Sequence, residues 1–105
     1  METKRQEKIA RLIQKEMGKL FQNELSQLAN GGMLTITKAK ISPDLSVAKV
    51  YISFLAIDDK EAVIENINKN EPQIRFLFGK QIRTQLRIVP HLKFFIDDSL
   101  DYYDN

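Results

Sequence analysis

Lysine and arginine side chains recur at helical spacing in two separate stretches of this sequence. In the first stretch they follow one another at intervals of four, three, four and four residues, at Lys4, Lys8, Arg11, Lys15 and Lys19. In the second they are Arg75, Lys80, Arg83 and Arg87, and residues 73–93 contain no Asp or Glu. At roughly 100° per residue each set gathers on one side of a helix, with Arg75 nearer the boundary. Exposed cations of this kind bind the phosphates of a nucleic acid and release its counterions. The two stripes therefore indicate that the protein binds a polyanion.

Each basic stripe has an alternative interpretation as a solvated helix face. Phe76 lies among the second set and also has two interpretations. It either stacks on an unpaired base or packs at the rim of the core. Three further lysines, Lys38, Lys40 and Lys49, are weaker candidates because the sequence does not fix which faces of their strands they occupy.

The residues needed for catalysis do not form a recognisable set. There is one histidine, His91, next to Pro90, and there are no cysteines, so we expect a structural or solvated histidine and no thiolate chemistry. The spacing of Asp97, Asp98, Asp101 and Asp104 lacks the glycine and terminal glutamate of a calcium loop. Phosphate-binding glycine motifs are also missing. We therefore expect no enzyme activity, no metal and no cofactor.

Length and composition favour one small domain. The chain has 105 residues, which suits a single core, and we assign residues 1–100 to one domain and 101–105 to a short acidic tail. The net charge of +2 hides an uneven distribution of charge along the chain. Residues 1–20 hold six Lys/Arg against three Glu, while residues 94–105 hold four Asp and no base. No signal peptide or membrane span is expected, so we expect a cytoplasmic protein, and nothing requires more than a monomer.

The elements that position these residues read in the order α-β-β-α-α-β. A first helix is predicted from about Thr3 to Leu28, opened by a Thr3/Gln6 capping box and ended at Gly31-Gly32. Strands are predicted over 33–41, with a bulge near Lys38, and over 47–56, antiparallel across a Pro43-Asp44 turn. Ala48, Val50, Ile52 and Phe54 should share one face of the second strand, with Lys49, Tyr51 and Ser53 on the other.

The remaining elements are two helices and a strand. Asp58-Asp59 can cap a short helix, with Asp58 and Glu61 as a capping-box pair. A break at residues 68–72 separates it from a helix running from Pro72 to Pro90, and residues 91–97 form the third strand. The fold class is α+β, with the helices on one side of a three-stranded sheet.

Several motifs, in register over nearly the whole chain, carry a resemblance to a known family. They are Lys8-Ile9-Ala10, Thr35-Ile36-Thr37, Ser42-Pro43-Asp44-Leu45-Ser46-x-Ala48-x-Val50-Tyr51-Ile52-Ser53, Ile74-Arg75, Leu86-Arg87-Ile88-Val89-Pro90-x-Leu92-x-Phe94 and Asp97-Asp98-Ser99. The chain resembles ribosome-binding factor A, a bacterial family of small-subunit maturation factors.

The resemblance implies a KH-like fold of the αββααβ type. It also implies binding to the immature 30S subunit, support for late folding and processing of 16S rRNA, a link to growth in the cold, and release by a GTPase or another factor. KH domains clamp RNA with a GxxG loop, and this family has an Ala-x-Gly kink there. The matching residues here are Asn70-Glu71-Pro72, and because an acid replaces the phosphate clamp, we expect no RNA contact at that turn. The alternative function is a protein-interaction module whose basic helices dock an acidic partner protein.

Overall fold

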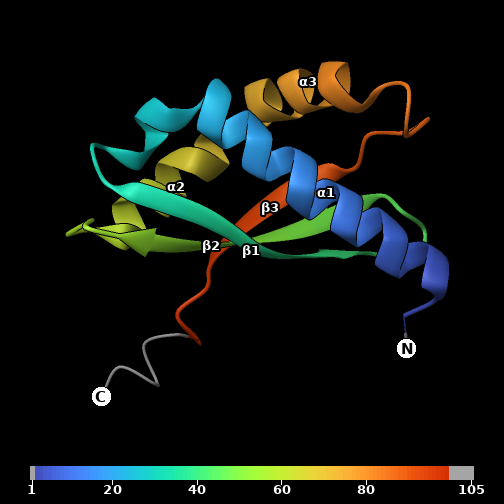
Figure 1. Ribbon diagram of the computed structural model, residues 1–105, viewed down its shortest axis with the longest axis horizontal. Helices are drawn as coiled ribbons and strands as arrows, with labels where there is room; N and C mark the ends of the chain where they lie inside the picture. The colour runs from blue at the N-terminus through green and yellow to red at the C-terminus, as the bar shows by residue number, and fades with distance from the viewer. Residues whose placement is uncertain (1, 100–105) are drawn as a thin grey trace.

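The computed structural model describes residues 2–99 and has the predicted α+β architecture. The elements are α1 (Lys4–Asn23), the short 3-10 helix η1 (Ser26–Ala29), β1 (Met33–Ile41), β2 (Val47–Leu55), α2 (Lys60–Lys69), α3 (Glu71–Ile82) and β3 (His91–Ile96). Figure 1 shows α1 and α3 side by side above one face of the sheet. The acidic tail assigned to residues 101–105, with Asp101 and Asp104, lies outside the described residues.

The sheet is mixed, with the strand order β1-β2-β3. β1 and β2 are antiparallel, as predicted, and β3 is parallel to β2. The register of the first pair shifts between Ile36 and Lys38, which confirms the bulge. The extra residue, Thr37, moves the side chains of Ala39 and Ile41 onto the same buried face as Ile36, since residues in a strand otherwise alternate between faces.

The core lies between this face of the sheet and the helices. The predicted inward residues of β2, Ala48, Val50, Ile52 and Phe54, are all buried. Across from them, Ile13, Met17, Leu20 and Phe21 of α1 and Ile74, Phe78 and Ile82 of α3 are buried too. The rings of Phe21 and Phe94 meet edge to face, with centroids 5.9 Å apart, a favoured geometry for aromatic pairs.

Both edges of the sheet are closed by polar side chains from the helices. On β1, the amide groups of Gln6 and Gln14 donate to the carbonyls of Ile41 and Thr37, at 3.2 and 3.1 Å. On β3, the Asn68 amide both accepts from and donates to the Phe94 backbone, each at 2.9 Å. These bonds occupy backbone groups that would otherwise be available to another chain.

The first helix is shorter than predicted. The prediction to Leu28 was wrong, because α1 ends at Asn23 and the chain continues as η1. On a straight continuation, Ala29 would lie on the solvent side with the lysines, at about 100° per residue, whereas the 3-10 turn buries it together with Leu25. Asn30 and Gly31 then take positive φ values of 51° and 84°, so the glycine link to β1 is confirmed.

The third helix also ends early. The prediction of a helix up to Pro90 was wrong, because α3 stops at Ile82 and its last turn closes with bonds from Gln85 and Leu86 to the Ile82 carbonyl. β3 starts beside Val47, the first residue of β2. A parallel strand requires the chain to travel back to that end of the sheet, and residues 83–90 form this connection.

The break between α2 and α3 is confirmed, since Asn70 closes one helix and precedes the other. The predicted cap of α2 at Asp58-Asp59 is confirmed for one of the two residues. The cap is Asp59, whose side chain accepts from the Ala62 backbone at 3.0 Å, so the Asp58/Glu61 capping box was wrong. β2 ends at Leu55 and β3 at Ile96, one residue earlier than predicted in each case.

Candidate nucleic-acid interface

The first basic stripe forms one exposed face of α1. Its residues are Lys4, Lys8, Arg11, Lys15 and Lys19, all of them exposed, and we call this set the α1 basic face. The opposite side of the helix is buried against the sheet through Ile13, Met17 and Leu20, so the cations must face solvent. The predicted capping box is present, with bonds of 3.0 and 3.1 Å between Thr3 and Gln6. Gln6 also binds β1, which fixes the start of the face relative to the sheet.

Most of the α1 basic face carries uncompensated charge. Lys19 lies 3.4 Å from the Glu16 carboxylate. Glu16 is itself buried and accepts from the amide of Gln81, which links α1 to α3. Over the described part of the chain, the other four cations of this face form no ion pair. Their charge is therefore available to an external anion.

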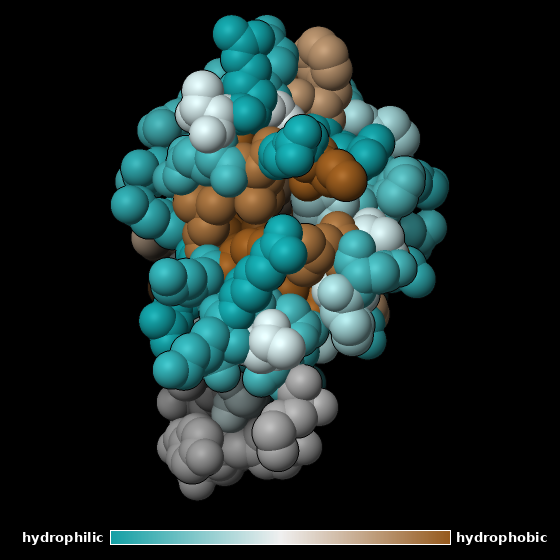
Figure 2. Space-filling model, turned by 90° about the vertical axis from the view of Figure 1, so that its right-hand side faces the viewer, coloured by the Kyte–Doolittle hydropathy of each residue, from teal (hydrophilic) through white to brown (hydrophobic). Residues whose placement is uncertain are grey.

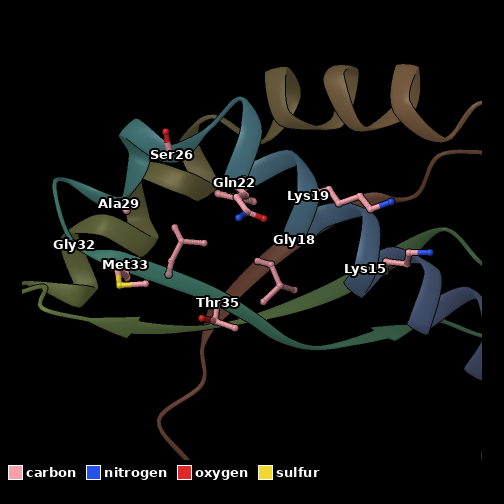
Figure 3. A pocket seen from close by; sticks show the side chains of 12 residues that line it. Lys15, Gly18, Lys19, Gln22, Ser26, Ala29, Gly32, Met33 and Thr35 are labelled. Atoms are coloured by element: carbon pink, nitrogen blue, oxygen red, sulfur yellow. The ribbon is translucent and has the colours of Figure 1, made fainter.

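A pocket of about 530 Å³ lies between the second half of α1, η1 and β1. Figure 3 shows Lys15 and Lys19 extending from α1 away from the Met33 end of this pocket, with Gly18 on the pocket side of both. Gly18 lines the pocket without adding a side chain to it. The pocket supplies a recess beside two cations of the α1 basic face.

The second basic stripe is divided by the early end of α3. Phe76 and Lys80 of α3, together with its C-cap residue Arg83, are exposed on the side opposite the buried residues of α3, and we call these three the α3 outer face. Phe76 is 64% exposed, so packing at the rim of the core was wrong. The ammonium group of Lys80 lies 5.5 Å from the centroid of the Phe76 ring, a cation–π distance. Phe76 is therefore an exposed aromatic ring beside a cation.

Arg75 lies apart from that face. Its guanidinium donates to the Val89 carbonyl at 2.7 Å and to the Pro90 carbonyl at 3.1 Å. Both acceptors belong to the connection that returns the chain to β3. The geometry gives Arg75 a structural contact that holds this connection against α3.

Arg87 lies in the same connection and not on a helix, so its predicted placement on the α3 face was wrong. It lines a groove of about 800 Å³ at one end of the molecule, together with Arg5 and Lys8 of α1. We call this the end groove. Its other lining residues are Ile9, Ile41, Asp44, Leu45, Gln85, Leu86, Ile88 and Pro90. Figure 2 faces this end and shows an apolar hollow rimmed by hydrophilic residues. The tertiary structure thus brings Arg87 beside Lys8, and Arg5 is a groove residue that the sequence pattern did not single out.

Two carboxylates near these surfaces are held ionised. Hydrogen bonds from the hydroxyls of Ser42 and Ser46 and from the Ser46 backbone lower the pKa of Asp44 to about 2. The Asp97 pKa is also lowered, first by the Thr37 hydroxyl. Asp44 lines the end groove, so the groove combines three cations with one fixed anion.

The turn at Asn70-Glu71-Pro72 is used structurally. The Glu71 carboxylate accepts from the Leu92 backbone at 2.8 Å, which extends the closure of the β3 edge. It also lies 4.0 Å from the Nδ1 atom of His91, whose side chain is largely exposed. An acid engaged with the sheet edge leaves this turn without the amide cradle of a phosphate clamp.

The lysines whose strand faces were uncertain are now placed. Lys38, Lys40 and Lys49 are exposed on the sheet face that points away from the helices. Lys93 of β3 is exposed there as well, and sequence reasoning missed it although the alternation of residues 92–96 pointed to it.

The described residues contain no cluster of His, Asp or Glu able to hold a metal ion. Among the helices of residues 2–99, none has the length and apolar character to cross a membrane.

The fold and surfaces define a KH-like α+β domain with a cationic helical side. A family model described as ribosome-binding factor A matches residues 5–105, and this chain belongs to that family. A ribosome-binding factor A from Cytophaga hutchinsonii is 44% identical over 102 residues, covering 97% of this chain and 77% of the relative. One from Christiangramia forsetii is 41% identical over 104 residues, covering 98% and 79%.

Solved structures agree on the fold. The crystal structure of ribosome-binding factor A from Thermus thermophilus superposes with a TM-score of 0.71 at 18% identity, over 87% of this chain and 94% of that one. A homology model of the Thermus thermophilus factor, fitted into a map of its complex with the 30S subunit, has a TM-score of 0.65 at 18% identity, over 85% and 91%.

Proposed function

We propose that this protein is a non-catalytic ribosome maturation factor. In this proposal it binds the immature 30S subunit and assists late folding and processing of 16S rRNA through its basic helix faces. Membership of the ribosome-binding factor A family supports the role, and the 30S complex of the Thermus thermophilus relative supports the partner. The observation that carries the RNA contact is the α1 basic face, with four exposed cations that have no ionic partner among the described residues.

The two helices present their cations on the same side of the molecule. The Gln81 amide donates to the Glu16 backbone at 2.7 Å, so α1 and α3 are neighbours. Their buried faces both point to the sheet, and the α1 basic face and α3 outer face therefore point away from it. A structured RNA laid over this side meets cations from both helices, and Phe76 offers a stacking surface to an unpaired base.

In the proposed mechanism the protein holds the small subunit in a partly folded conformation. Charge-led contacts to a partly folded subunit favour the conformation that fits both helices, because binding shifts a population toward the state bound more tightly. The factor leaves when the mature conformation no longer presents that surface, with a GTPase or another factor completing its displacement. Growth in the cold, where misfolded RNA resolves slowly, is the condition that would need it most.

The test is a charge-removal pair on α1. Lys8→Gln with Lys15→Gln keeps good helix-forming residues while removing two cations. Binding to purified immature and mature 30S subunits is measured by sedimentation at several salt concentrations. Each lost phosphate contact should reduce the slope of log K against log salt by about 0.7–0.9, so the pair should lower it by about 1.4–1.8.

The control is Lys69→Gln, which removes an exposed lysine of α2 that is paired with Glu65 and lies off both basic faces. It should leave the slope unchanged. Equal affinity and slope for the α1 pair and the wild type would overturn the RNA contact.

The second candidate is a module that docks an acidic protein partner. The observation that favours it is the end groove, whose apolar lining includes Ile88, 73% exposed, beside Arg5 and Arg87. Nuclease treatment of a pull-down separates the two functions. Partners that are lost after treatment support RNA binding, and partners that remain support the protein-docking function.

A further inference from the structure

The sheet has a second face that the proposed function does not use. Figure 1 shows α1 and α3 above the sheet, and no helix of the described residues covers its lower side. The side chains on this face alternate with the buried ones along each strand. The middle of this face is polar or aromatic, and its aliphatic residues, Met33, Val47 and Leu55, lie at the strand ends.

Three lysines form a row across this open sheet face. Lys40 of β1 is the register partner of Lys49 of β2, which is in turn the register partner of Lys93 of β3. All three are exposed. Like charges directly opposite one another on neighbouring strands are destabilising, so the row costs the isolated protein stability.

Nothing on the described chain neutralises this row. Glu2 lines the same shallow depression as Lys40 and Lys49, yet none of the three lysines forms an ion pair within residues 2–99. An external polyanion is the group that would turn an unfavourable row into a favourable one.

An aromatic row lies next to the lysines. Tyr51 and Phe95 are register partners two residues further along β2 and β3. Their rings stack with centroids 5.5 Å apart and planes 28° from parallel. The Lys38 ammonium group lies 4.8 Å from the Tyr51 centroid, and Phe95 is 39% exposed. The two rings are outside the core, and the more exposed ring of Phe95 can stack on a further ring on its side away from Tyr51.

We propose that this open sheet face binds single-stranded RNA, with phosphates on Lys40, Lys49 and Lys93 and a base stacked on the Tyr51–Phe95 pair. A basic surface with adjoining aromatic rings is the chemistry that single strands require, and sheets that stack bases on exposed aromatics bind RNA in this way. Neighbouring strands lie about 4.8 Å apart, and residues two apart lie about 6.6 Å apart along a strand. The phosphate row and the base platform are therefore within the reach of one nucleotide.

This site is on the opposite side of the molecule from the α1 basic face. With both surfaces occupied, the protein would hold two RNA segments at once. The inference does not depend on the proposed function, since the sheet face can fail as a site while the helices still bind the subunit.

The experiment uses the full chain and a 12-nucleotide single-stranded RNA of mixed sequence, with an RNA duplex and a polyglutamate peptide as comparison probes. Affinity is measured by fluorescence anisotropy at several salt concentrations, and the contact surface by amide chemical shifts. Phe95→Leu keeps an apolar side chain but removes the stacking ring. It should weaken binding of the single-stranded RNA by about 5- to 150-fold, the range for one stacked base. Lys49→Gln with Lys93→Gln should lower the salt slope by about 1.4.

The outcomes are distinguishable. Shifts at residues 49–51 and 93–95, with weakening in both variants and thermal midpoints kept near wild type, support the site. Shifts confined to α1 and α3, or an unchanged affinity for Phe95→Leu, overturn it. Polyglutamate binding that depends equally on Phe95 overturns it in favour of an acidic protein partner. The Lys8→Gln/Lys15→Gln variant reports on the helical side alone, so loss of 30S binding there, with the sheet-face shifts retained, separates this inference from the proposed function.

Discussion

Arg75 provides the sharpest test of which cations stabilise the fold and which are available to RNA. It belongs to the basic stripe of the sequence, yet its guanidinium donates to the carbonyls of Val89 and Pro90 at 2.7 and 3.1 Å. The test variant is Arg75→Met. Methionine replaces the aliphatic part of the arginine side chain but lacks its charge and its hydrogen-bond donors. Its matched control is Arg83→Met at the C-terminal cap of α3, because Arg83 is exposed and has no such bonds within the described chain.

The expected loss of stability follows from those two bonds. A hydrogen bond from a charged group contributes about 1.5–3 kcal/mol. The Arg75 side chain is half-buried and both bonds are partly buried, so water replaces part of what is lost. We expect Arg75→Met to lower the free energy of unfolding by about 1.5–3 kcal/mol in total, and the thermal midpoint by roughly 4–8 °C for each kcal/mol.

The assay is urea denaturation followed by circular dichroism, paired with 30S binding at several salt concentrations. Arg83→Met should change stability by less than about 0.5 kcal/mol and should lower the salt slope by about 0.7–0.9. Arg75→Met should show the reverse pattern, with lost stability and an unchanged slope. Equal stability of the two variants, or a salt slope that falls for Arg75→Met alone, would refute the structural role.

Three other predictions test the fold and its pH dependence. Phe78→Ala empties a fully buried position and should cost about 3–5 kcal/mol of unfolding free energy in urea titrations; a loss below about 1 kcal/mol would contradict the placement of α3. A Cβ at Gly32 would lie 2.8 Å from the carbonyl oxygens of Leu55 and Ala56, whereas one at Gly18 meets nothing within 4 Å. Gly32→Ala should therefore destabilise, and Gly18→Ala should stabilise by about 0.5–1 kcal/mol; the same sign for both would contradict the packing. The Asp44 pKa is lowered from 3.8 to about 2, so its contribution to stability is full above pH 3.8 and is lost as the pH falls through about 2. Asp44→Asn should be less stable than wild type at pH 5, with a difference that shrinks toward pH 2, and a constant difference would contradict the shift.

The order of elements, the class of fold and the family followed from the sequence because each rests on local patterns. The Thr3/Gln6 capping box, the phase change at the bulge and the break at Asn70 are all properties of a few neighbouring residues. Burial on β2 followed from strict alternation. The spacing of apolar and basic residues in α1 was enough to predict its basic face, since a helix that buries one apolar side must turn the other side to solvent.

Where α1 and α3 end, and hence where their last cations point, was decided by the tertiary structure. Helical periodicity continues past Asn23 and Ile82, but burial of Leu25 and Ala29 ends the first helix, and the return to a parallel β3 ends the second. The same return placed Arg87 in the end groove and committed Arg75 to two carbonyls. The second basic stripe, residues 75–87, was therefore predicted correctly from composition, but its placement on one helix face was wrong.

The register of the sheet was the other tertiary decision. Lys40, Lys49 and Lys93 are far apart in the chain, and no local pattern relates them. Antiparallel pairing on one side of β2 and parallel pairing on the other place them in one row, with Tyr51 and Phe95 in the next. The sequence by itself determined that these lysines belong to strands, because each lies in a short run of alternating apolar residues. Only the pairing of the strands, which is set by burial of the other face, decided that they would meet.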